Sequence, residues 1–274
     1  MKELEQLIRK NILRFTSYTC ELNKHTEGNG KIMLNNNENP YNKPFNRYPD
    51  PLQIELKKRI SPIKRIYPDC IFIGNDSGET IDLIYRCFTE PRIDNVVAIE
   101  PTFKMYRVCA DINDIEYRMV ELDEDFQISA DKILSATDEH TKIIWICSPN
   151  TPTGNDLNIN EIIRIITEFD GIVIVDEMYS DFSCQQPFRL ELHKYPNLIV
   201  LDTFSKAWGC AALCVGMAYA QPAIIDIFNK VKYPYNINSL TQETINMQLD
   251  KRYEVDKWIS IMLMERERML ESFS

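Results

Sequence analysis

The chain reads IIWICSPNTPTG over residues 143–154, IVIVDEMY over residues 172–179 and LIVLDTFSK over residues 198–206. Each segment starts with a run of apolar residues that has no polar alternation, and then changes abruptly to polar residues. Strands that are buried on both faces of a sheet have this composition, because neither face meets water. The three segments therefore predict central strands of a parallel sheet, each followed by a polar loop.

Similar apolar runs occur on either side of these three segments, at residues 70–73, 95–99 and 216–220. Amphipathic stretches that predict helices separate the runs, at residues 79–88, 103–112, 129–136, 159–168 and 222–231. Alternation of strands and helices is typical of an α/β domain with a mostly parallel central sheet, and the right-handed crossover rule places helices on both faces. Ligands of such sheets bind at the carboxyl ends of the strands, where we expect the chemistry.

The two ends of the chain predict further elements. Residues 2–15 predict one amphipathic helix, and the polar, proline-containing residues 23–46 predict an extended arm. A helix is predicted for residues 51–60 and one long helix for residues 252–273. We therefore expect three parts, namely an N-terminal helix and arm over residues 1–50, a large domain over residues 51–250, and a linking helix over residues 251–274.

Composition and charge restrict the class of partner. The formal net charge of −10 repels the phosphate backbone of nucleic acids, so we expect no nucleic acid. The sequence contains neither a basic amphipathic run nor an apolar stretch of roughly 18 residues, so we expect no membrane contact. The eight cysteines form no CxxC pair and have no histidine at ligand spacing, which predicts neither a metal site nor a disulfide framework. Reduced thiols favour a cytoplasmic protein.

Polar groups that together suit one cofactor follow four of the predicted strands. Asp176 and Lys206 follow two strands, Asn150 lies in the turn after a third, and Ser77 and Gly78 form a turn before a helix. Taken singly, these residues have ordinary explanations as a loop carboxylate, a surface lysine and a helix cap. Together they suit a cofactor that has a phosphate, a ring nitrogen and an aldehyde, because these groups are bound by helix N-termini, carboxylates and lysines respectively.

Seven segments match one family in residues and in order. They are LNNNENPY at 34–41, RYPD at 47–50, ETID at 79–82, PTFKMY at 101–106, SPNTPTG at 148–154, VDEMY at 175–179 and TFSKAWG at 203–209. In these segments the chain resembles the fold-type-I aminotransferases that depend on pyridoxal 5'-phosphate (PLP), and among them the histidinol-phosphate aminotransferases. The resemblance implies a PLP-dependent transferase-like large domain, with a small C-terminal domain that is largely missing from these residues.

The resemblance also implies roles for individual residues. Three would be catalytic: Lys206 would bind the aldehyde covalently and then move a proton, Asp176 would pair with the ring nitrogen, and Tyr179 would hydrogen-bond the ring oxygen. The other cofactor contacts would be Asn150 at the ring oxygen, Phe103 on the ring face, Ser77, Gly78, Thr203 and Ser205 at the phosphate, and Tyr48 at the phosphate of a neighbouring subunit in a homodimer. The implied reaction transfers an amino group between histidinol phosphate and 2-oxoglutarate.

Departures from the family pattern leave two alternatives open. Cys214 stands where the family has an arginine that binds the cofactor phosphate, and a thiol cannot replace a bidentate guanidinium. In the phosphate turn, Asp76 replaces a glycine and Gly78 replaces an acidic residue. Together with the expected absence of the small domain, these changes suit a truncated and catalytically impaired remnant. The second alternative is an enzyme similar to the threonine-phosphate decarboxylases, which share these motifs.

Overall fold

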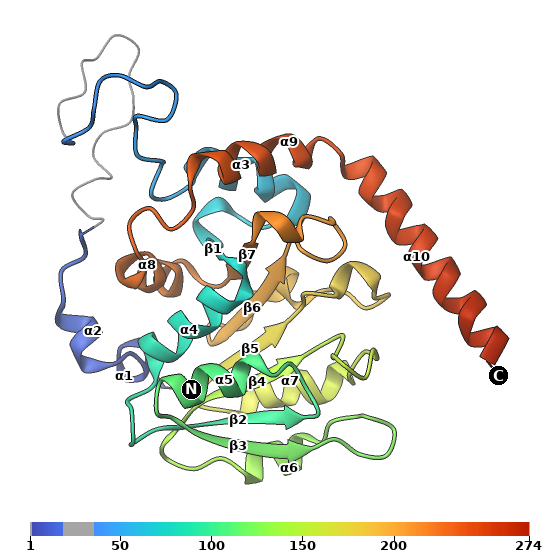
Figure 1. Cartoon of the computed structure of the whole chain (residues 1–274). Helices are drawn as coiled ribbons and strands as arrows, with labels where there is room; N and C mark the ends of the chain where they lie inside the picture. Colours follow the sequence, from blue (N-terminus) through green and yellow to red (C-terminus); the bar gives the residue numbers. More distant parts are fainter. Residues whose placement is uncertain (1, 19–35, 274) are drawn as a thin grey trace.

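The structure is a computed structural model that describes residues 2–18 and 36–273, and its centre is a seven-stranded sheet (Figure 1). The strand order is β1-β7-β6-β5-β4-β2-β3. The strands are β1 (Ile71–Asn75), β2 (Asn95–Glu100), β3 (Glu116–Glu121), β4 (Thr141–Cys147), β5 (Ile172–Asp176), β6 (Leu198–Thr203) and β7 (Val215–Tyr219). The strand β7 runs antiparallel to both of its neighbours, β1 and β6, and the other paired strands are parallel, so the prediction of a mostly parallel sheet is confirmed.

The strand β3 was not predicted, whereas the six other strands match the apolar runs. Each residue of β3 is either exposed or half-buried, and its sequence EYRMVE carries three charged side chains. The reason is its position, because β3 pairs only with β2 and forms one edge of the sheet. Unlike β1 at the opposite edge, whose residues 71–74 are buried, β3 is also open to water on its faces, so it lacks the continuous apolar run of a central strand.

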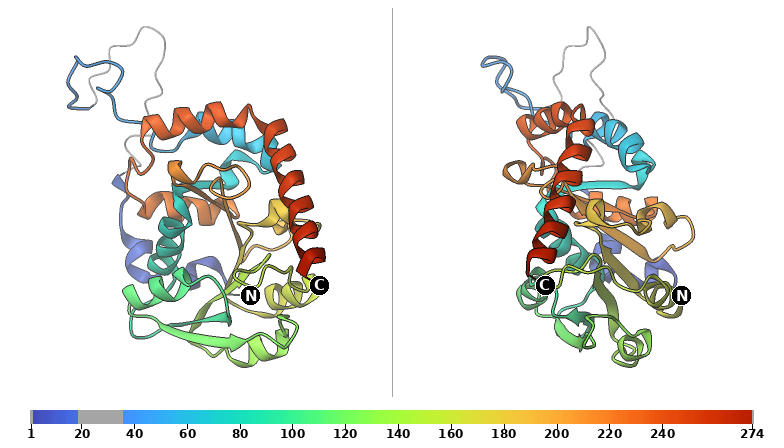
Figure 2. Two further views of the ribbon diagram at one scale, coloured as in Figure 1. Left: turned by 45° about the vertical axis from the view of Figure 1, so that its right-hand side comes forward. Right: turned by 90° about the vertical axis from the view of Figure 1, so that its right-hand side faces the viewer.

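Helices cover both faces of the sheet, as predicted (Figures 1 and 2). The helices of the large body are α3 (Ile54–Lys64), α4 (Asp76–Phe88), α5 (Met105–Ile112), α6 (Ala130–Ser135), α7 (Ile159–Glu168), α8 (Pro222–Val231) and α9 (Ser239–Leu249). Side chains of α4, α5 and α8 form one buried apolar cluster with the sheet, and those of α3, α6, α7 and α9 form a second cluster on the opposite face.

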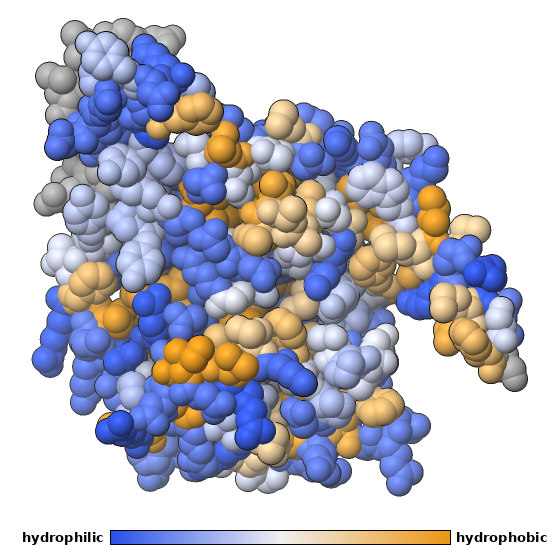
Figure 3. Space-filling model, in the orientation of Figure 1, coloured by the Kyte–Doolittle hydropathy of each residue, from blue (hydrophilic) through white to orange (hydrophobic). Residues whose placement is uncertain are grey.

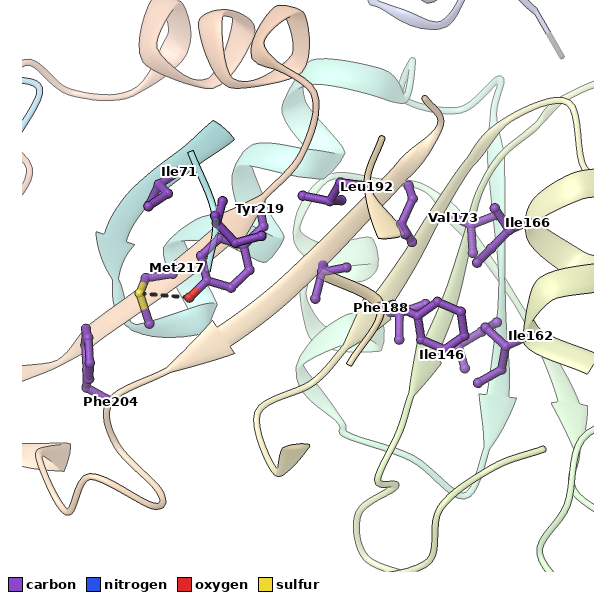
Figure 4. Packing of buried hydrophobic residues seen from close by; sticks show 14 of the residues in the cluster. Ile71, Ile146, Ile162, Ile166, Val173, Phe188, Leu192, Phe204, Met217 and Tyr219 are labelled. Atoms are coloured by element: carbon purple, nitrogen blue, oxygen red, sulfur yellow. Dashed lines mark hydrogen bonds between the residues drawn. The ribbon is translucent and has the colours of Figure 1, made fainter. Parts of the chain in front are cut away.

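Successive residues of β6 show how the sheet separates the two apolar clusters. Val200 belongs to the cluster of α3, α6, α7 and α9, whereas Leu201 belongs to the cluster of α4, α5 and α8. Both side chains are buried because each face of the strand is covered by helices. Figure 4 shows the first of these faces, where Val173 of β5 faces Ile166 of α7.

Two predictions for the N-terminal part are wrong in detail. Residues 2–15 form two short helices, α1 (Leu4–Leu7) and α2 (Lys10–Arg14), because Ile8 and Arg9 are extended and the Arg9 N–H donates a hydrogen bond to the Cys87 carbonyl at 2.9 Å. The predicted helix at 51–60 instead spans α3, which begins at Ile54 and continues past Pro62. Of the predicted arm, residues 23–35 lie outside the described residues, and residues 36–46 form turns and bends.

The last helix, α10 (Arg252–Phe273), confirms the prediction for residues 252–273 and projects from the body (Figure 1). Its buried residues are Val255 and Ile259, near its start. Most of the other apolar side chains of α10 are exposed, whereas Leu263 is half-buried against the core. Apolar residues of this helix are visible in Figure 3. Among the helices that the structure describes, none is both long and apolar enough to cross a membrane.

Candidate active site

Neighbouring strands bring the three predicted catalytic residues to the carboxyl ends of the central strands of the sheet. Asp176 ends β5 and pairs in register with Leu201 of β6, and β6 ends shortly before Lys206. The Lys206 ammonium nitrogen lies 5.5 Å from the ring centroid of Tyr179. The parallel β5 and β6 therefore place Asp176, Tyr179 and Lys206 at their shared carboxyl end, although the Lys206 side chain is exposed and not buried in a cleft.

Asp176 is a buried carboxylate without a cationic partner in the described part of the chain. Its side chain has 0% exposure, Oδ2 accepts a hydrogen bond from the Tyr106 hydroxyl at 2.7 Å, and Oδ1 accepts one from the Met178 N–H at 3.2 Å. Burial raises the pKa of Asp176 to about 6, and the two hydrogen bonds oppose this rise because they favour the charged form. A carboxylate in this position is a strong acceptor for a cationic N–H group.

The predicted phosphate residues converge on Gly216 of β7. Gly216 pairs in register with Thr203, and a Cβ atom on Gly216 would lie 2.6 Å from the Ser77 nitrogen. Ser77 and Gly78 occupy the first turn of α4, and a Cβ atom on Gly78 would have no neighbour within 4 Å. The first turn of α4 therefore packs against β7 at Ser77 and is open at Gly78, and the N-terminus of a helix is a position that suits a phosphate.

Cys214, which the resemblance assigns to the place of the family's phosphate-binding arginine, lies directly against this turn. Its carbonyl accepts a hydrogen bond from the Asp76 N–H at 2.7 Å, and its thiol is exposed. Asp76 itself has a φ of +58°, the left-handed conformation that glycine adopts most readily. The substitution of a glycine by Asp76 therefore falls at a backbone position where a side chain is disfavoured, although aspartate tolerates this region better than most residues.

Three further predicted contacts have partners within the protein. The buried Asn150 side chain donates hydrogen bonds to the Pro101 carbonyl at 2.9 Å and the Thr153 hydroxyl at 2.8 Å, and accepts one from the Thr102 hydroxyl at 2.9 Å. The Ser205 N–H donates to the Thr203 hydroxyl oxygen at 3.0 Å, and that hydroxyl donates to the Val215 carbonyl at 3.1 Å. These bonds fix the turns that follow β4 and β6.

Two predicted aromatic contacts lie apart from one another. The half-exposed Phe103, just before α5, packs edge-on against Tyr106 with ring centroids 5.6 Å apart, and so lies close to the hydrogen-bond partner of Asp176. Tyr48, in contrast, is 56% exposed in the N-terminal arm and stacks on Tyr235 at 4.5 Å. Asn75 at the end of β1 donates to the carbonyl of Asn236 at 2.6 Å, which places this part of the arm beside the phosphate turn rather than beside Lys206.

A comparison of the sequence with protein families identifies the chain. The profile of the family "Aminotransferase class I and II" matches residues 10–273. The protein belongs to this aminotransferase family. The chain is 54% identical over 274 residues to a histidinol-phosphate aminotransferase of Bacteroides thetaiotaomicron, with 100% of this chain and 79% of that protein covered. A histidinol-phosphate aminotransferase of Parabacteroides distasonis is 46% identical over 269 residues, which cover 98% of this chain and 78% of that protein.

Solved aminotransferase structures share the fold. The crystal structure of histidinol-phosphate aminotransferase from Sinorhizobium meliloti in complex with pyridoxal 5'-phosphate superposes with a TM-score of 0.75 at 18% sequence identity. The match covers 81% of this chain and 61% of that chain, so this protein spans less than two thirds of the length of the Sinorhizobium enzyme. At this identity the similarity shows the fold, which confirms the predicted PLP-dependent transferase-like architecture.

Pyridoxal phosphate is the cofactor of the aminotransferase. Most of the described residues at the carboxyl ends of the strands suit the binding of this cofactor. Asp176 provides an acceptor that lacks a cation, Lys206 provides an exposed amine, and the first turn of α4 provides N–H groups. These are the groups that a ring nitrogen, an aldehyde and a phosphate require. The exception is Cys214, because its thiol brings no charge to the phosphate.

Sequence analysis missed the buried polar groups behind the site. Tyr106 was not given a role, although it lies one helical turn after Phe103. Lys64 of α3, with 1% exposure, was also missed, and its Nζ lies 2.8 Å from Asp202 Oδ2. Asp202 Oδ1 in turn accepts the Thr203 N–H at 2.7 Å, so this ion pair fixes the end of β6. No local pattern marks Lys64, because its partner lies far along the chain.

Proposed function

We propose that this aminotransferase transfers the amino group between histidinol phosphate and 2-oxoglutarate. The substrate assignment is supported by the relatives from Bacteroides thetaiotaomicron and Parabacteroides distasonis, which are 54% and 46% identical and are histidinol-phosphate aminotransferases. The geometry that carries the proposal is the placement of buried Asp176 and the Lys206 amine at the carboxyl end of adjacent parallel strands. We also infer that the ten predicted contacts act as the family resemblance implies.

The bound cofactor would supply an aldehyde carbon that takes up the amino group and a ring that accepts electrons. Lys206 Nζ would hold that aldehyde and then, as a free amine, take the proton from the substrate α-carbon. Asp176 would hold the ring nitrogen in its protonated form, and burial makes this pairing stronger than it would be in water. The N–H groups of Ser77 and Gly78 would orient the phosphate.

The larger organisation is part of the same proposal. We infer a homodimer in which Tyr48 serves the partner's phosphate, since 56% of Tyr48 is exposed on the arm. We also infer a division into residues 1–50, 51–250 and 251–274, and a cytoplasmic location. The seven cysteines among the described residues are all free thiols, which supports a reducing compartment. The expected reactants are a small amino donor and a 2-oxo acid.

Impaired cofactor binding is a second candidate that two observations favour. Cys214 borders the phosphate turn without a charge, and Asp76 holds a left-handed conformation and brings a carboxylate to the same turn. Loss of one charge-assisted phosphate contact would weaken cofactor affinity by roughly 1.5–3 kcal/mol. A protein of this kind would keep the fold and bind the cofactor only at high concentration.

Formation of glutamate tests the proposed function. Purified protein, saturated with the cofactor, should convert histidinol phosphate and 2-oxoglutarate to glutamate, and a Lys206→Ala variant should not. Release of carbon dioxide from a phosphorylated amino acid, without glutamate, would instead identify a decarboxylase. Absence of both products from a folded, cofactor-saturated protein would leave the impaired remnant as the correct description.

A further inference from the structure

Three buried aromatic rings form a stack beneath Asp176. Tyr106 of α5 stacks on Trp145 of β4 with centroids 4.7 Å apart and an interplanar angle of 15°, and Trp145 stacks on Tyr85 of α4 at 5.4 Å and 29°. All three side chains have 0% exposure. The Tyr85 hydroxyl also donates a hydrogen bond to the Tyr106 carbonyl at 2.7 Å. Stacking on Trp145 therefore fixes the plane of the Tyr106 ring, whereas the Tyr85 hydroxyl contacts the backbone of Tyr106.

Tyr106 touches two groups that the cofactor ring would meet. Its hydroxyl donates a hydrogen bond to Asp176 Oδ2 at 2.7 Å, and the edge of its ring packs against Phe103. Asp176 would face the ring nitrogen and Phe103 would face the ring plane. A single immobilised side chain thus contacts both the carboxylate and the aromatic platform of the proposed site.

The surroundings of Asp176 make this hydroxyl important. Asp202 of β6 and Asp76 at the start of α4 are carboxylates whose charge opposes ionisation of Asp176, and the Cys147 thiol of β4 lies close by. Burial opposes ionisation as well. Among the described residues, the two groups shown to donate hydrogen bonds to the Asp176 carboxylate are the Tyr106 hydroxyl and the Met178 N–H. Each donor stabilises the charged carboxylate in a dry environment.

We propose that Tyr106 is a positioning residue for the cofactor ring, whose hydroxyl keeps Asp176 ionised and fixes its Oδ2 atom so that the carboxylate is directed at the ring nitrogen. The inference rests on the proposed function, since it assigns Tyr106 to the same site. Tyrosine suits this task because its phenol remains a neutral donor at physiological pH. Burial raises the pKa of Tyr106 well above its ordinary range, so the donor persists under basic conditions also.

A Tyr106→Phe variant tests the inference, because phenylalanine keeps the ring stack on Trp145 and removes only the hydroxyl. Pyridoxal phosphate affinity of the variant, measured by titration of the visible absorption band, should fall roughly ten- to hundredfold. Affinity should rise with pH as Asp176 ionises. In the variant, the inflection of that curve should move to higher pH, because the carboxylate has lost a donor that favours its charged form.

Tyr85→Phe is the matched control, since it removes a hydroxyl from the same stack without touching Asp176. It should leave the affinity and the inflection close to those of the parent protein, whatever it does to thermal stability. Asp176→Asn provides a second measurement. In that background the Tyr106→Phe change should have little further effect on affinity, because the carboxylate on which it acts is gone.

The outcomes separate the two proposals. Equal affinity and an unshifted inflection in Tyr106→Phe would overturn the positioning role, while the parent protein's binding would leave the proposed function intact. Failure of the folded parent protein to bind the cofactor would overturn the proposed function and this inference with it. If Tyr106→Phe does not fold, the titration of the Asp176 carboxyl carbon by NMR in the parent and Tyr85→Phe proteins decides. A carboxyl that stays protonated at neutral pH there would overturn the inference, and an ionised carboxylate whose titration is coupled to the Tyr106 hydroxyl proton would support it.

Discussion

Cys214 is the residue whose chemistry departs furthest from what a bound phosphate requires. It lies at the start of β7 with a φ of +50°, and its carbonyl accepts the Asp76 N–H of the phosphate turn. We expect a Cys214→Arg variant to bind pyridoxal phosphate roughly ten- to hundredfold more tightly than the parent, because a guanidinium adds a charge-assisted bidentate contact to the phosphate. Equilibrium titration with the cofactor measures the change.

The neutral variant Cys214→Ser serves as the control for that experiment. It replaces the thiol by another small polar group and should leave the affinity unchanged, since it brings no charge. If the arginine variant gained nothing over serine, either the phosphate would lie elsewhere or other groups would already neutralise it.

The buried carboxylate of Asp176 lowers the stability of the cofactor-free protein, and a cationic ring nitrogen would remove this penalty. Its pKa in the folded protein is about 6, compared with an ordinary value of 3.8, so the folded state favours the protonated form. This penalty is absent below the ordinary value and fully present above the folded value, where it is on the order of 3 kcal/mol. We therefore expect Asp176→Asn to become more stable, relative to the cofactor-free parent, as the pH rises from about 4 to neutral.

Urea denaturation of both proteins at several pH values measures this difference. Asp256→Asn, which changes an exposed carboxyl on α10, should show no such dependence. A constant difference between Asp176→Asn and the parent over the same range would show that the buried carboxyl titrates normally. The asparagine variant should also lose transaminase activity, because its neutral amide cannot hold a ring proton.

At the scale of elements, the phosphate turn depends on the close approach of β7 to the first turn of α4. A Cβ atom on Gly216 would lie 2.4 Å from the Asp76 carbonyl carbon and 2.5 Å from its oxygen, which are backbone atoms that cannot rotate away. We expect Gly216→Ala to lower stability by roughly 1–3 kcal/mol and to weaken cofactor binding, since the turn must shift. Thermal denaturation and cofactor titration measure both effects.

Gly78→Ala is the control for this experiment, because it also replaces a glycine by alanine but creates no steric clash. An added Cβ at Gly78 would have no neighbour within 4 Å, so its fold should be as stable as that of the parent. If both variants melted at the parent's temperature, the tight packing between Gly216 and Asp76 would contribute nothing to stability.

Elements were predictable where local sequence determines the environment. The runs IIWIC, IVIV and LIVL, which lack polar alternation, predicted β4, β5 and β6. Asp176 and the Lys206 segment lie at the carboxyl ends of the neighbouring parallel strands β5 and β6. The local sequence pattern failed to predict elements whose structure depends on contacts with residues far along the chain. The edge strand β3 resembles a surface segment, α9 has a weakly amphipathic sequence, and the break at Ile8 and Arg9 depends on the Cys87 carbonyl.

The same distinction holds within the site. Motifs in the chain predicted residues that follow a strand, because the strand itself is visible in the sequence. The hydrogen bond from Tyr106 to Asp176 and the ion pair from Lys64 to Asp202 join residues that are remote in sequence. Such contacts form only when β5, β6, α3 and α5 pack together, so the periodicity and motif spacing of the sequence do not predict them.

At the scale of the whole molecule, the arm that carries Tyr48 projects from the body and is held there by stacking on Tyr235 (Figure 1). Tyr48 is 56% exposed, so a second copy of the chain could contact this residue. If Tyr48 binds the cofactor phosphate of the partner subunit, two defective variants should complement one another in a mixed dimer. We expect a mixture of Lys206→Ala and Tyr48→Phe subunits, refolded together, to recover activity at limiting cofactor concentration.

The recovery has a definite size, because only the heterodimer contains an intact site. In a random mixture, about a quarter of all sites would combine an intact Lys206 with an intact Tyr48 from the other subunit. A mixture of Tyr48→Phe with the double variant Lys206→Ala/Tyr48→Phe contains no such site and should remain at the activity of Tyr48→Phe alone. If Tyr48 served its own subunit, the first mixture would gain nothing over its components.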